Sequence, residues 1–172
     1  MTLPAPIWRR FAAAVYDGLL LLGLWMAALM LDTVVRDTVG VDREWHALRA
    51  YLFLIGLAFF GWFWTHGGQT LGMRAWHLHL RRTDGQPPRW SDAALRYALM
   101  LLCWGVALTP ALLQLPRLAA GPHARSATVV SGLAIVLGLL LTRLDARRRA
   151  PQDWLSGTET VYAPKTDTPQ AT

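Results

Sequence analysis

One long apolar run near the N-terminus constrains this chain more than any other feature. From Ile7 to Leu31 the sequence reads IWRRFAAAVYDGLLLLGLWMAALML, and after Arg9 and Arg10 its single charged residue is Asp17. An α-helix rises 1.5 Å per residue, so about 20 apolar residues cross the roughly 30 Å hydrocarbon core of a bilayer. The run therefore predicts a membrane-spanning helix that carries an acidic side chain.

The polar side chains of this helix share one face. Asp17 follows Arg10 by seven residues, which places both on nearly the same face as Ala13, Ala14 and Gly18. Small residues let helix backbones approach closely, so we expect this face to pack against protein. A carboxylate at the centre of a span costs about 2.5–3.5 kcal/mol. Two interpretations of Asp17 stay open: an acid that handles protons or ions or gates their passage, or a polar group that fixes helix packing.

The composition agrees with a membrane domain. The 172 residues are 53% hydrophobic and only 16% charged, whereas about 25% charge is typical of soluble domains. We predict an all-α membrane protein: a four-helix transmembrane bundle that forms a single domain over residues 1–163, followed by a disordered tail at 164–172. The predicted spans are 7–31, 47–65, 92–113 and 127–144.

Arginine and lysine residues indicate the orientation. The segment from 66 to 96 holds five arginines against two aspartates, and five basic residues follow position 142. Because positive charge marks the cytoplasmic side, we predict that both termini lie in the cytoplasm. Three arginines beside the last span predict a basic anchor for anionic lipid: Arg147, Arg148 and Arg149. No basic run belongs to a soluble fold that could present it, so nucleic acid is not an expected partner.

A short β element is predicted between the second and third spans. The sequence AWHLHLRR alternates like a strand, and Asp84-Gly85 follows it as a turn signal. We expect the segment 76–82 to pair with 158–163 in a small cytoplasmic sheet. Ser91 is the predicted N-cap of the third span.

The glycine-rich loop at 67–72 does not predict a nucleotide site. Its spacing is not that of a P-loop and it contains no lysine. We expect a tight turn in which Gln69 and Thr70 satisfy backbone groups at a helix end.

The sequence also gives no support for catalysis, a cofactor or a metal. His66, His77 and His79 lack a cysteine or a nearby acid that would complete a metal site, so we interpret them as polar residues of a turn and strand. No serine lies in a nucleophile turn. We predict that the protein is not an enzyme.

Four motifs, in order, resemble those of the RDD family of small bacterial membrane proteins. Arg10, Ala13 and Asp17 resemble the arginine, alanine and first aspartate of its opening helix. The second motif is the loop GQTLGMR, which resembles the family's Gly-Gln-Thr-Leu-Gly-Lys-Arg signature with Met73 in place of lysine. Its matching residues are Gly68, Gln69, Thr70, Gly72 and Arg74. In the third motif, Ser91 and Arg96 resemble the serine and arginine at the start of the family's next helix.

The fourth motif closes the chain. PQDWLSGTETVY resembles the family's final pattern, with Asp153 as the second aspartate, Gln152 where a histidine is common, and Gly157 and Thr158 in their places. The resemblance implies a multi-pass protein of the bacterial cytoplasmic (inner) membrane. The family has no established general function, and some members have been described as cation/proton antiporters or as transport-related.

Two functional hypotheses follow. In both, Arg10, Asp17, Arg96 and Asp153 form a charged cluster in which the arginines neutralise the aspartates, and we favour a structural and gating network over a direct ion ligand. The first hypothesis is exchange of a monovalent cation for protons, with Asp17 titrating. Four helices are few for a transporter, so this requires a homo-oligomer or a membrane protein partner. The second is a scaffold that binds a partner or anionic lipid through its cytoplasmic loop and tail.

Overall fold

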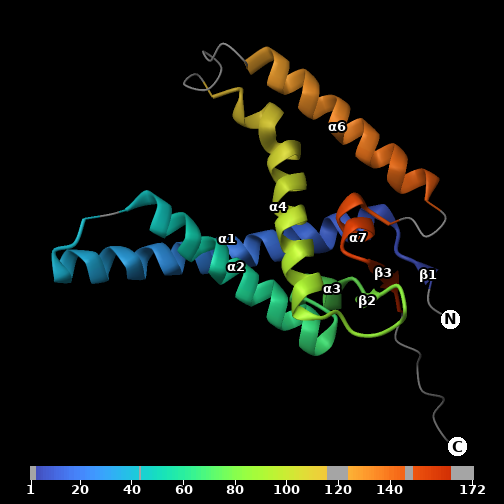
Figure 1. Ribbon diagram of the computed structural model, residues 1–172, viewed down its shortest axis with the longest axis horizontal. Helices are drawn as coiled ribbons and strands as arrows, with labels where there is room; N and C mark the ends of the chain where they lie inside the picture. Colours follow the sequence, from blue (N-terminus) through green and yellow to red (C-terminus); the bar gives the residue numbers. More distant parts are fainter. Residues whose placement is uncertain (1–2, 43, 116–123, 146–148, 164–172) are drawn as a thin grey trace, which may run out of the picture.

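The computed structural model describes residues 3–42, 44–115, 124–145 and 149–163 (Figure 1). Within them, four helices are long and apolar enough to cross a membrane, as predicted. They are α1 (Ile7–Val39), α2 (Trp45–Gly67), α4 (Trp90–Leu112) and α6 (Ala124–Leu144). The shorter elements are β1 (Leu3–Pro4), α3 (Leu71–Ala75), β2 (Leu78–Arg82), α7 (Pro151–Leu155) and β3 (Thr158–Tyr162).

Helix α1 extends beyond its predicted end at residue 31. The polar stretch that follows continues the helix to Val39, where Gly40 adopts the left-handed conformation and donates its N–H to the carbonyl of Arg36 at 2.8 Å. Arg36 also pairs with Asp32 one turn earlier, with 2.8 Å between Nε and Oδ1. An opposite-charge pair at this spacing stabilises a helix, so the loss of apolar character does not mark the helix end.

Helix α4 begins before the residue that we predicted to cap it. The N-cap is Arg89, and Ser91 lies inside the first turn, so the prediction for Ser91 was wrong. The Asp92 carboxylate instead accepts the backbone N–H of Arg89 at 3.1 Å. A carboxylate three residues after the N-cap can accept the backbone N–H of the N-cap residue, which has no partner within the helix.

The predicted strand pair is present and has a third member. Strands β2 and β3 are antiparallel, with Leu80 opposite Thr160, and β1 pairs with the other edge of β3 in the order β1-β3-β2. Leu78 and Leu80 are fully buried on one face of β2. We call the sheet together with α3 and α7 the headpiece.

In the described residues, the long helices pack mainly on their neighbours along the chain. Helix α1 packs on α2, α2 on α4, and α4 on α6; the headpiece contacts α1 through α3 and α4 through α7. In Figure 1 the α1–α2 and α4–α6 hairpins extend from the headpiece in different directions. The described N-terminal strand and the described C-terminal strand therefore meet at the same end of the molecule, in one sheet.

An aromatic core joins α2 to α4. Phe60, Trp64 and Tyr97 are almost completely buried, and the ring of Phe60 lies 4.9 Å from Trp64 and 5.6 Å from Tyr97 between centroids. A Cβ on Gly56 would lie only 1.9 Å from the Tyr97 hydroxyl oxygen, so only glycine fits there. This core holds Arg96, the residue before Tyr97, at the junction with the headpiece.

Candidate functional site

Two buried carboxylates lie where the long helices meet the headpiece. Asp17 on α1 has 4% of its surface exposed, and Asp153 on α7 has 1%. Carboxylates are almost never this buried without hydrogen-bond or ionic partners. The partners of Asp17 and Asp153 therefore indicate the role of each carboxylate.

Asp17 is held by the segment that leads from α2 into α3. Thr70 donates its hydroxyl to Oδ2 at 2.5 Å, and the Gly72 backbone N–H donates to Oδ1 at 2.8 Å. The Thr70 oxygen also accepts the N–H of Met73 at 3.2 Å as the N-cap of α3. Both oxygens of Asp17 therefore accept a hydrogen bond from the segment 70–72, and Thr70 connects the carboxylate to the start of α3.

Two glycines allow the chain to reach Asp17. Gly68 ends α2 in the left-handed conformation, with φ of 62°, which a glycine adopts without strain. Gly72 lies directly on α1: a Cβ there would be 2.5 Å from the carbonyl oxygen of Ala13 and 2.9 Å from Oδ1 of Asp17. Any larger residue would push α3 away from α1.

Asp153 binds arginines from two different long helices. Nη1 of Arg10 on α1 donates to Oδ2 at 2.8 Å, and Nη1 of Arg96 on α4 donates to Oδ1. The same carboxylate accepts the Ala150 N–H at 3.3 Å, which caps α7. One side chain of the headpiece thus ties α1 to α4.

Strand β3 adds further hydrogen bonds to both arginines. Nη2 of Arg10 donates to the Thr160 carbonyl at 2.8 Å, and Arg96 donates to the hydroxyls of Thr158 and Thr160 at 2.9 and 3.4 Å. The Arg96 guanidinium also lies 5.2 Å from the centre of the Trp64 ring. Removing one partner from such a buried pair typically costs about 3–5 kcal/mol.

The structure divides the four residues that we expected in one charged cluster. It brings Arg10, Arg96 and Asp153 together. Within the described residues no ion pair joins Asp17 to an arginine, because hydroxyl and amide donors occupy it instead. The expectation that arginines neutralise both aspartates therefore holds in geometry for Asp153 alone.

The remaining motif residues position the turns around this site. Gln69 donates its side-chain amide to the Leu78 carbonyl at 2.7 Å and so ties the loop to β2. Gly157 turns the chain from α7 into β3 with φ of 63°, and the side chain of Arg74 is exposed. Of the predicted lipid anchor, Arg147 and Arg148 lie outside the described residues, as does the tail from 164. Arg149 forms an ion pair with Asp145 at 3.0 Å.

Sequence reasoning missed three contacts. Trp64 and Thr160 were not singled out, and the loop motif was not connected to Asp17. No local pattern could indicate these contacts, since each joins residues more than 30 positions apart. One signal could have indicated the contact of the loop with Asp17: Asp17, Thr70 and Gly72 all belong to motifs that resemble those of the RDD family.

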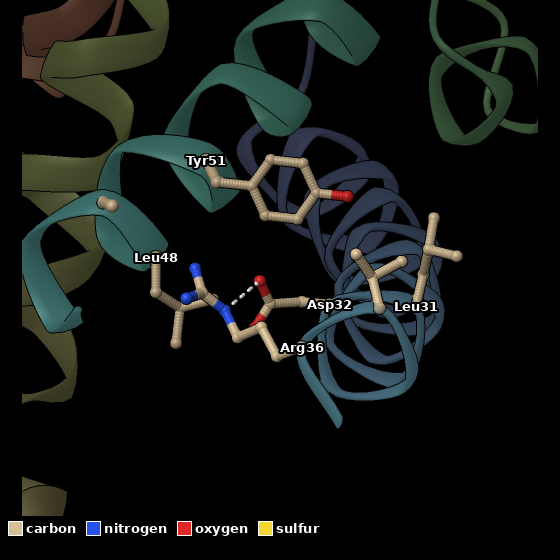
Figure 2. Close-up of a pocket in the computed structure, with 7 residues that line it drawn as sticks. Leu31, Asp32, Arg36, Leu48 and Tyr51 are labelled. Carbon is tan, nitrogen blue, oxygen red and sulfur yellow. Dashed lines mark hydrogen bonds and ion pairs between the residues drawn. The ribbon is translucent and has the colours of Figure 1, made fainter. Parts of the chain in front are cut away.

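A pocket of about 340 Å³ lies between the end of α1 and the start of α2. Figure 2 shows Tyr51 and Leu48 on α2 facing the Asp32–Arg36 pair on α1. The residues that line this pocket do not include Asp17 or Asp153; they are Leu31, Asp32, Val35, Arg36, Ala47, Leu48 and Tyr51. Within the described part of the chain, no group of three or more His, Cys, Asp or Glu side chains could hold a metal ion.

Four span-length apolar helices fastened to a small polar headpiece define a multi-pass membrane protein. The family comparison agrees: the sequence model of the RDD family matches residues 4–157. The chain therefore belongs to the RDD family. No curated protein and no solved structure matches it.

Proposed function

We propose that this protein is a non-transporting, non-enzymatic membrane platform, in which the long helices hold the headpiece at the membrane surface for a partner protein or anionic lipid. The observation that supports this most is that both oxygens of each buried carboxylate accept a hydrogen bond or an ion pair from within the fold. Each joins the headpiece to a different set of helices. In this proposal, Asp17 and Asp153 hold the headpiece against the long helices.

The environment of Asp17 argues against a transport role. A group that exchanges ions must be reached from water at some stage of its cycle, whereas Asp17 is 4% exposed with both oxygens occupied. The described pocket lies at the other end of the α1–α2 hairpin. Transport would require α3 to leave α1 and would break both contacts.

The positive charge of the loops supports an orientation with the headpiece and both termini in the cytoplasm, at the bacterial inner membrane. The headpiece includes α3 and β2 from the arginine-rich segment between α2 and α4, and α7 and β3, which follow the arginines at 147–149 in the sequence. Such segments remain on the cytoplasmic side during insertion. In this orientation the headpiece faces soluble partners and the inner leaflet.

Cation/proton exchange is the alternative, and the position of Asp17 within a span-length helix favours it. Because each chain offers only four such helices in the described residues, exchange would take place in an oligomer or with a membrane protein partner. In that case Asp17 would titrate as α3 opens.

A flux assay decides between the two. Purified protein is reconstituted in vesicles that contain a pH dye and is challenged with Na⁺, K⁺ and Li⁺. The platform predicts no pH change above that of empty vesicles, and a lower thermal midpoint for Asp17→Asn than for Asp37→Asn, an exposed acid on the same helix. Cation-dependent flux that disappears only in Asp17→Asn would establish exchange instead.

A further inference from the structure

Arg9 and Arg10 are neighbours in sequence but have different environments. Arg10 binds Asp153, whereas the guanidinium carbon of Arg9 lies 4.3 Å from the centre of the Tyr162 ring and 5.1 Å from that of Trp8. Both distances are within the range of favourable cation–π contact. The two rings thus hold the Arg9 guanidinium in place without neutralising its charge.

Arg9 has no anionic partner in the described residues. No hydrogen bond or ion pair of its side chain is present there, although many arginines of this chain do bind a carboxylate. Those that do are Arg10, Arg36, Arg81, Arg82, Arg96 and Arg149. The N–H donors of Arg9 are therefore available to an external acceptor.

The surroundings of Arg9 are those of a membrane–water interface. Trp8 is 57% exposed and packs edge-on against Trp76, with 5.4 Å between ring centres, and Phe11 is 62% exposed one turn further along α1. Tryptophan and tyrosine gather at the level of lipid headgroups, and α1 enters its apolar run directly after this turn. In a bilayer that α1 crosses, this position would place Arg9 at the level of the headgroups of the adjacent leaflet.

We propose that Arg9, held between Trp8 and Tyr162, binds the phosphate of an anionic phospholipid. The planar guanidinium presents a fork of N–H donors that matches two phosphate oxygens. The aromatic rings fix its plane, so less side-chain freedom is lost on binding. The unneutralised charge of Arg9 then favours a lipid with net negative charge over a zwitterionic one.

This inference deepens the proposed function, because it names one ligand of the headpiece and the residues that hold it. It places a lipid contact at the start of α1, separate from the predicted basic anchor, of which Arg147 and Arg148 lie outside the described residues. Within that anchor, Arg149 already pairs with Asp145. Arg9 offers an unneutralised charge at the start of α1, where the sheet and the long helices meet.

Native mass spectrometry of the full-length protein tests the proposal. Detergent-solubilised protein is titrated with phosphatidylglycerol and, in parallel, with phosphatidylcholine. Arg9→Gln should weaken phosphatidylglycerol binding about fivefold, the effect of one arginine at a membrane surface, and leave phosphatidylcholine binding unchanged. The matched control is Arg89→Gln, an exposed arginine at the N-cap of α4 and outside the aromatic cluster, which should bind both lipids as the wild type does.

Two variants of the aromatic partner separate the cluster from charge alone. Tyr162→Phe keeps the ring and should retain the preference for phosphatidylglycerol, whereas Tyr162→Leu removes a ring and should reduce it. Since Tyr162 belongs to β3, the thermal midpoint of each variant is measured alongside. If Tyr162→Leu does not fold, the comparison of Arg9→Gln with Arg89→Gln decides the question.

Three results would overturn the proposal: equal phosphatidylglycerol binding by Arg9→Gln and wild type, an equal loss in Arg89→Gln, or displacement of the lipid by millimolar inorganic phosphate. The last would indicate a soluble phosphate ligand. Ion flux in vesicles combined with an intact Arg9 effect would refute the platform and leave the lipid site standing. The two failures are therefore distinguishable.

Discussion

Gly72→Ala tests how closely α3 must approach α1. The added methyl group would lie 2.5 Å from the Ala13 carbonyl oxygen and 2.9 Å from both Cγ and Oδ1 of Asp17. These atoms belong to a helix backbone and to a hydrogen-bonded carboxylate, so neither can give way freely. Helix α3 must move outward, and the 2.8 Å bond from the Gly72 N–H to Asp17 lengthens or breaks.

Two effects set the size of the loss. Overpacking a close contact costs about 1–3 kcal/mol, and a hydrogen bond to a charged group contributes about 1.5–3 kcal/mol. Because a backbone shift that relieves the clash weakens the bond, the two partly overlap, and we expect a destabilisation of about 3 kcal/mol from these ranges. For a chain of this size that corresponds to a thermal midpoint lower by roughly 6–12 °C.

The assay is thermal unfolding of purified protein in detergent, followed by the loss of the monodisperse peak in size-exclusion chromatography. Gly18→Ala is the matched control, since a Cβ on Gly18 meets nothing within 4 Å in the described structure. Its midpoint should stay near the wild-type value. A Gly72→Ala protein as stable as the control would refute the close contact of α3 with α1.

The other predictions concern the second carboxylate and the sheet. Asp153→Asn should lower the free energy of unfolding by about 3 kcal/mol or more, while Asp84→Asn, at an exposed turn, should change it by less than about 1 kcal/mol in the same thermal assay. Burial, and next the charge of Arg81, lower the pKa of His79 below its usual 6.5. The folded protein therefore favours neutral His79, so the contribution of His79 to stability is full above about pH 6.5 and falls as the pH drops toward the lowered pKa. The difference in thermal midpoint between wild type and His79→Gln should therefore change as the pH is lowered from about 6.5. A difference that stays constant over this range would contradict the lowered pKa. Gly68→Ala should destabilise the protein by about 1–2 kcal/mol, because its φ is 62° and a Cβ would lie 2.6 Å from Cε1 of His79; unchanged amide hydrogen exchange in β2 would contradict this.

The spans and the strand pair could be predicted because each depends on a pattern along the chain. A run of about 20 apolar residues is enough to indicate a span, and alternation in 76–82 was enough to indicate β2. The end of α1 could not be predicted in the same way. The pair of Asp32 with Arg36 keeps a polar segment helical, and hydropathy does not register it.

The sequence predicted which residues form the candidate site but not which of them contact one another. The sequence indicated that Arg10, Asp17, Arg96 and Asp153 act near one end of the helices, yet it could not say which arginine reaches which acid. That choice depends on how α7 folds back after the last span and on how Gly72 brings α3 against α1. Both are features of packing in three dimensions and have no local signature.

The central claim is that Asp17 fastens α3 to α1, and a double-mutant cycle tests it most directly. Thermal or denaturant unfolding is measured for wild type, Asp17→Asn, Thr70→Val and the double variant. The contacts predict a coupling free energy of about 1.5–3 kcal/mol, because Thr70 donates to the carboxylate at 2.5 Å. Effects that add within about 0.5 kcal/mol would mean that the two residues do not interact, and would contradict the account.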